Sequence, residues 1–209
     1  MIRSIHLRNI AGSGWREIFV RDDRAAQLVE FAVTLPLLVV FVVGIFDFSN
    51  AFTLKQKLTN ITRDAARAAA VAPANDLQSP PSQGPASVLA AFLVVDHYLI
   101  ANNINDCGIS TSVPSSSGLT WTYQGNTNCP ASGLTLIINR GYYFPPTGAA
   151  LPGVACTSQP PGGQTAIIGT CVSIQYAYPW RFSRAASLLG ATATLPRNIS
   201  AVAVAMNEN

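Results

Sequence analysis

The stretch FAVTLPLLVVFVVGIF, residues 31–46, decides the fold of this chain, because its only polar side chain is Thr34. A helix needs about 20 predominantly apolar residues to cross the hydrocarbon core of a bilayer. The preceding residues, AQLVE at 26–30, extend the run to that length only if Glu30 is included. We therefore expect one membrane-spanning helix over residues 26–48, with an acidic residue inside the span.

A carboxylate in a span needs an explanation, since a charge near the bilayer centre costs about 3 kcal/mol on insertion scales. By default such a residue is functional and has a partner that neutralises it. Alternatively, the Glu30 side chain reaches back to the cytoplasmic interface, because Arg24 lies only six residues earlier.

Composition limits the class of protein further. The chain has 209 residues, of which 49% are hydrophobic and 11% are charged. It is too apolar for a purely soluble domain and too short for a transporter with many spans. The formal net charge of +3 arises in the N-terminal third, where acidic residues are mixed in, so we expect no nucleic-acid partner. Five arginines before the apolar run favour a cytoplasmic N-terminus, although basic residues between 55 and 67 weaken that asymmetry.

Helical periodicity continues after the span. Residues 49–72, SNAFTLKQKLTNITRDAARAAAVA, contain neither Gly nor Pro. Apolar residues recur every three or four positions, which predicts one buried helix face. They are Leu54, Leu58, Ile61, Ala65 and Ala69. We expect a continuous helix over residues 25–72, about 70 Å long at 1.5 Å per residue, with a kink at Pro36 where a backbone donor is missing.

The remainder predicts an outer α+β domain. Residues 73–87, PANDLQSPPSQGPAS, have the composition of a linker, and a second helix is expected after them in a domain of residues 88–209. Beyond Cys107 the segments LTWTY, LTLIIN, CVSIQYAYPWRF and ISAVAVAM alternate apolar and polar residues, as strands do. We expect an antiparallel sheet of three to five strands laid on the second helix and on the outer half of the long helix.

All four cysteines follow the span, which favours two disulfides in an oxidising compartment. Reduced thiols or a zinc site are the alternatives, but the sequence has no C-x-x-C pair. Three pairings are possible, and the one that joins neighbours in the sequence closes the smallest loops. The favoured pairs are Cys107 with Cys129 and Cys156 with Cys171.

No catalytic pattern is evident, and we expect no enzymatic activity and no cofactor or metal ion. Asp96 beside His97 is the one acid–histidine pair after the span, but the chain lacks a G-x-S-x-G motif. A helix histidine without a catalytic role is the more common case. Trp121 and Tyr123 are expected to pack in the core, because the glycines around them lack phosphate-loop spacing.

The N-terminal pattern resembles a known family. It consists of a charged leader, a small residue, four further residues, the pair Glu-Phe and an apolar helix with an early proline. Here these features are Arg24, Ala25, AQLV, Glu30–Phe31 and AVTLP. This order is similar to that of the TadE-like proteins, minor pseudopilins of the tight-adherence (Flp-type) pilus. ITRDAARAAA after the span and SIQYAYPWRF near the C-terminus are also similar to that family.

The resemblance implies processing and a partner for Glu30. A prepilin peptidase would remove a cytoplasmic leader, residues 1–25, by cutting between Ala25 and Ala26, although the family usually has Gly before the cut. Glu30 would then be the fifth residue of the mature chain. The new amine of Ala26 lies one helical turn from this carboxylate, so amine and carboxylate of neighbouring subunits would neutralise each other in lipid, with Phe31 beside them.

The resemblance also implies a location and partners. The chain would cross the bacterial inner membrane once, with its C-terminal domain periplasmic or extracellular. Its partners would be other pilus subunits, the prepilin peptidase, the inner-membrane assembly platform and the lipid bilayer, and its role would lie in pilus biogenesis, adhesion and surface colonisation. The alternative is an envelope binding domain with no pilus role, either anchored or secreted after a signal-peptidase cut at Ser49-Asn50-Ala51.

Overall fold

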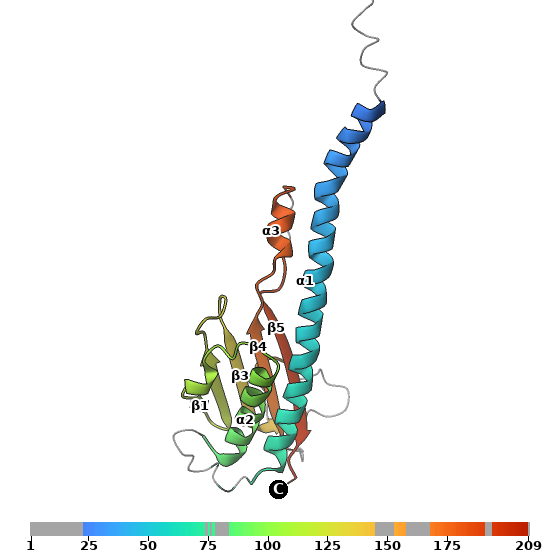
Figure 1. Cartoon of the computed structure of the whole chain (residues 1–209). Helices are drawn as coiled ribbons and strands as arrows, with labels where there is room; N and C mark the ends of the chain where they lie inside the picture. The colour runs from blue at the N-terminus through green and yellow to red at the C-terminus, as the bar shows by residue number, and fades with distance from the viewer. Residues whose placement is uncertain are drawn as a thin grey trace, which may run out of the picture.

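The architecture is a long helix with a sheet domain on its C-terminal half (Figure 1). A computed structural model describes residues 23–73, 75, 77, 84–144, 153–157, 168–190 and 194–208. The expected leader, apart from its last three residues, therefore lies outside the described residues, as does most of the expected linker.

Helix α1, Asp23–Val71, is 49 residues long and continues through Pro36. Its C-terminal half is buried on the face that the sequence predicted, since Leu58, Ile61, Ala65 and Ala69 are fully buried. Leu54 is partly buried against the same core. The N-terminal half is exposed and apolar, and residues 26–71 are the one described helix long and apolar enough to cross a membrane.

Five strands form a single antiparallel sheet in the order β1-β2-β3-β4-β5. Sequential strands are neighbours throughout. The strands are β1 Ser115–Ser117, β2 Thr120–Gly125, β3 Leu134–Tyr143, β4 Ile168–Ala177 and β5 Asn198–Met206. A 3-10 helix, η1 Ile109–Thr111, precedes β1.

One face of the sheet packs on α1 and on helix α2, Ala86–Ala101. Strand alternation places every second side chain on this face. The inward residues include Trp121, Tyr123, Leu134, Leu136, Ile138, Val172, Ile174, Tyr176, Ile199, Ala201 and Ala203. Phe92 of α2 stacks on Tyr123 with ring centroids 4.6 Å apart. The expected α+β fold, with a candidate span, a second helix and an antiparallel sheet, is confirmed.

The opposite face of the sheet carries a smaller cluster of Tyr142, Cys156 and Cys171. Cys156 and Cys171 form a disulfide that ties a loop to β4. The Asn139 amide adds a hydrogen bond to the Cys156 carbonyl at 2.8 Å. This loop shields part of the face that the helices leave uncovered.

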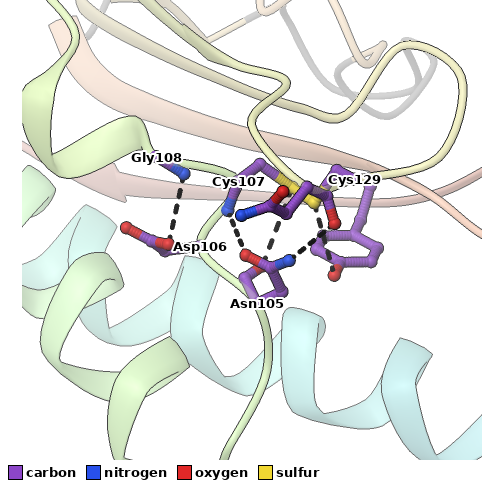
Figure 2. The surroundings of a disulfide bond; sticks show 7 residues. Asn105, Asp106, Cys107, Gly108 and Cys129 are labelled. Atoms are coloured by element: carbon purple, nitrogen blue, oxygen red, sulfur yellow. Dashed lines mark hydrogen bonds between the residues drawn. A yellow bond between two sulfur atoms is a disulfide. The ribbon is translucent and has the colours of Figure 1, made fainter.

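The second disulfide joins Cys107 and Cys129 in the turns that flank η1 and β2 (Figure 2). Asn105 accepts a hydrogen bond from the Cys107 backbone N–H at 2.9 Å and donates one to the Asn128 carbonyl at 2.9 Å. The backbone at Gly125 lies close to the backbone at Cys107, since a Cβ added to Gly125 would be 2.6 Å from the Cys107 carbonyl oxygen. Both disulfides have the pairing that the smallest-loop argument favoured.

The region after β4 differs from the sequence-based expectation. Helix α2 begins at Ala86, after the extended N-cap residue Pro85. Strand β4 ends at Ala177, so the segment YPWRF is not part of a strand as expected, and Pro179 has no N–H for a ladder. A short helix, α3 Phe182–Ser187, follows and was not expected.

Replacing both Cys156 and Cys171 by Ser should lower the free energy of unfolding of the sheet domain by about 3 kcal/mol, the chain-entropy value for a loop of this length. Urea unfolding in mild detergent, followed by the fluorescence of buried Trp121, measures this difference. Non-reducing peptide mapping must show that the Cys107–Cys129 bond is intact in the variant. An unchanged urea midpoint would mean that the Cys156–Cys171 bond does not stabilise the domain.

Candidate assembly site on the N-terminal helix

The N-terminal half of α1 presents large apolar side chains on every side. Phe31 is 61% exposed, Phe41 63% and Ile45 69%. A helix that is apolar all round belongs in a membrane or between other helices. This half of α1 is therefore the surface available for lipid or for neighbouring subunits.

Glu30 is exposed on this apolar surface. It has no hydrogen-bonding or ionic partner within the part of the chain that the structure describes. Ala26 lies one helical turn earlier in the same continuous helix, so a positive charge at its nitrogen would lie on the same side as the carboxylate. Within the described residues, the Glu30 carboxylate is therefore accessible on the surface of the helix.

Pro36 lies inside α1 one and a half turns after Glu30. The helix is assigned without a break on both sides, and Thr34 donates a hydrogen bond to the Phe31 carbonyl at 3.3 Å. A kink at Pro36 stays a prediction.

Asp47 is the first charged residue after the apolar run, and it is 4% exposed. One carboxylate oxygen accepts hydrogen bonds from the backbone N–H groups of Arg181 at 2.8 Å and Phe182 at 2.9 Å. The other accepts a hydrogen bond from the Tyr178 hydroxyl at 3.1 Å. The carboxylate thus caps the start of α3 from another helix, a role that Ser, Thr or Asp usually performs from the helix's own N-cap position.

Aromatic rings surround this carboxylate. Phe48 lies 5.2 Å from Trp180 and 5.7 Å from Phe182, centroid to centroid. Gly44 permits the approach of α3, since an added Cβ would lie 3.0 Å from the Phe182 ring. Figure 1 shows α3 standing beside α1, above the sheet and level with the apolar half.

Tyr178 is affected by the same contact. Burial raises its pKa to about 12, and the hydrogen bond to Asp47 acts in the same direction. The hydroxyl therefore stays neutral and remains a donor at physiological pH.

The other end of α1 is held by a buried cation. Arg140, 1% exposed, lies at the irregular part of β3. Its guanidinium donates hydrogen bonds to Thr170 at 2.5 Å, to Asn207 at 2.9 Å and to the carbonyl of Ala72 at 3.4 Å. A cation beside the last carbonyls of a helix is electrostatically favourable.

The adjacent residues Asp96 and His97 of α2 differ in burial. His97 is exposed, whereas Asp96 is buried. Burial raises the pKa of Asp96, with a further contribution from Asp106. Among the described residues, no three potential metal ligands lie together.

The residues of α1 also match a family model. Residues 25–67 match the family model of the TadE-like proteins. No curated protein and no solved structure matches the chain. The TadE-like match includes Ala25, Glu30, Pro36 and Asp47, and it ends before α2 and the sheet. It confirms the resemblance drawn from the N-terminal pattern and associates the chain with pilus machinery in general.

Sequence reasoning proposed Glu30 and Phe31 as contact residues, which stays a prediction, and it missed Asp47 and α3. A charged residue directly after an apolar run is commonly solvated, so the residue type of Asp47 did not indicate that its side chain is buried. Its donors come from residues 178–182, far away in the chain. The one available hint was Pro179, which argues against a strand through YPWRF.

Replacing Asp47 by Ala should detach α3, since two backbone N–H groups lose their acceptor in a buried position. We expect a local loss of about 3 kcal/mol, or roughly a 100-fold faster hydrogen exchange of the Arg181 and Phe182 amides. Asp64→Ala, at an exposed position of the same helix, is the matched control and should leave both rates unchanged. Equal exchange in the two variants would show that Asp47 does not hold α3.

Proposed function

We propose that this chain is a minor pseudopilin, an assembly component of a tight-adherence type IV-like pilus. The observation that carries the proposal is that the TadE-like signature coincides with an apolar half-helix that the sheet domain leaves uncovered. Such a helix has to be covered by lipid before assembly and by other subunits during it. Pilus biogenesis, adhesion and surface colonisation are the processes in which we place it.

We further propose that α1 crosses the bacterial inner membrane once, with the N-terminus cytoplasmic. The arginines that precede the span support this orientation under the positive-inside rule. The two disulfides of the sheet domain support a periplasmic or extracellular location, since such bonds persist in oxidising compartments.

Glu30 provides the assembly contact in this proposal. Cleavage between Ala25 and Ala26 by a prepilin peptidase would create an amine one turn from the carboxylate. In a hydrocarbon environment both charges are costly alone, and their pairing between neighbouring subunits offsets the cost. The helix Ala26–Phe31 thereby positions one subunit against the next, and the role of the chain is structural and not enzymatic.

An anchored or secreted binding domain remains the competing function. A signal-peptidase cut after Ala51 would fall in the middle of α1, where Ala51 itself is buried. It would also remove Asp47 and leave the Arg181 and Phe182 amides without their acceptor. These contacts favour retention of the whole helix.

Glu30→Ala should abolish co-purification with other pilus subunits while the chain remains at its normal level in the membrane. The reason is that Glu30 lies far from the sheet core and has no described partner in its own chain. Thr34→Ala, one turn further along the helix and also exposed, is the control and should retain the subunits. Undiminished co-purification of the Glu30 variant would refute the proposed contact.

Ala25→Gly should increase the processed fraction in cells that contain the peptidase, because a smaller residue enters the cleavage pocket more readily. The intact mass and N-terminal sequence distinguish a chain that begins at Met1, Ala26 or Phe52. A start at Phe52 would favour the secreted alternative. Full-length chain in both the parent and the variant would mean that the leader is a permanent tail.

A further inference from the structure

Helix α3 lies beside a part of α1 that belongs to the candidate span. About 20 residues cross the hydrocarbon core, so a span that begins near Ala26 ends near Phe46, directly before Asp47. Asp47 holds the first residues of α3 at this boundary. From there α3 runs back beside the apolar half of α1, toward Leu37 (Figure 1). Leu37 precedes Asp47 by ten residues, about 15 Å along a helix.

The residues at the far end of α3 are apolar and uncovered. Leu188 is 84% exposed and Leu189 47% exposed. Between α3 and α1 lies a groove of about 560 Å³, which we call the α1–α3 groove. Its lining side chains are all apolar and include Leu37, Val40, Phe41, Ile45, Ala186 and Leu189. A water-facing loop gains nothing from two adjacent exposed leucines, whereas a lipid-facing one does.

Several polar groups of this segment have hydrogen-bond partners within the protein, which lowers the cost of placing them in lipid. Asp47 accepts from the first two amides, and the last turn is closed by hydrogen bonds from the N–H groups of residues 188, 189 and 190 to carbonyls three residues earlier. The Ser183 hydroxyl donates a hydrogen bond to the Trp180 carbonyl at 3.1 Å, and the Ser187 hydroxyl donates one to the Arg184 carbonyl at 2.7 Å. These amides and hydroxyls therefore keep their hydrogen bonds if the segment leaves water.

Side chains typical of a membrane interface lie at the start of the segment. Trp180 and Tyr178 meet edge to face with centroids 4.9 Å apart, at the level of Asp47. Trp and Tyr are enriched where bilayer and water meet. Arg181 and Arg184 are exposed, and side chains of this length can extend from an apolar layer to lipid phosphates.

We propose that α3 and the turn Leu188–Gly190 dip into the outer leaflet of the membrane, the leaflet on the side of the sheet domain, and that lipid acyl chains fill the α1–α3 groove. The groove is continuous with the candidate span, so the same lipid that surrounds α1 reaches it. A helix of a second copy fits less well, because α3 has only six residues and offers less than two turns for helix packing. Acyl chains can fill an apolar groove without the regular side-chain packing that two helices need. This inference rests on the proposed insertion of α1 in a membrane.

A spin label measures the depth directly. All four cysteines of the chain are in disulfides, so a single introduced cysteine is the only free thiol. Leu188→Cys, Phe41→Cys and Val113→Cys are each labelled with a nitroxide in the full chain, reconstituted in vesicles of phosphatidylethanolamine and phosphatidylglycerol. Each replaced side chain is more than 60% exposed, so folding should be preserved. Collisions with oxygen report lipid, and collisions with a water-soluble nickel chelate report the aqueous phase.

The ratio of oxygen to nickel accessibility should be severalfold higher at Leu188 than at Val113, which lies beside the far edge strand β1. It should approach the ratio at Phe41 in the span. A water-like ratio at Leu188 with a lipid-like ratio at Phe41 would overturn the inference and leave the membrane anchor standing. A label at Leu188 shielded from both reagents would show that protein covers the groove, which also overturns it. A water-like ratio at Phe41 would contradict the membrane insertion itself.

Discussion

The capping of α3 by the buried carboxylate of Asp47 is the interaction on which the upper part of the molecule depends. A buried carboxylate is tolerated only where donors surround it, and here two amides and a phenol hydroxyl do so. Those donors belong to the connection between β4 and β5. The connection between β4 and β5 leaves the sheet and runs along α1, where its donors contact Asp47. The aromatic cluster, the close approach at Gly44 and the α1–α3 groove all follow from this route.

Helix α1 serves two environments along one axis. Its first half is apolar on all sides, whereas its second half buries a face of small and branched residues against α2, β4 and β5. Ala65, Ala66 and Ala69 are almost fully buried and allow neighbouring elements to approach closely. Asp47 near the middle and Arg140 at the end fix the helix to the domain at two points.

The TadE-like match ends at residue 67, so it describes the helix and leaves the sheet domain unassigned. The matched segment contains a small residue, an acid and an apolar run. The sheet domain instead depends on its own core and on two disulfides, whose paired cysteines lie 22 and 15 residues apart in the sequence.

The sequence by itself determined the long helix, its change from an exposed apolar half to a half with a buried face, the α+β class and the favoured disulfide pairs. Each of these depends on local quantities: run length, a spacing of three or four, strand alternation and loop length. The role of Asp47, the position of Arg140 and the existence of α3 were decided only by the tertiary structure. Asp47 meets donors more than 130 residues away, and Arg140 reaches Asn207 across 67 residues. No local periodicity encodes such pairs, because their energy arises only when the folded core brings the donor and the acceptor together and excludes water.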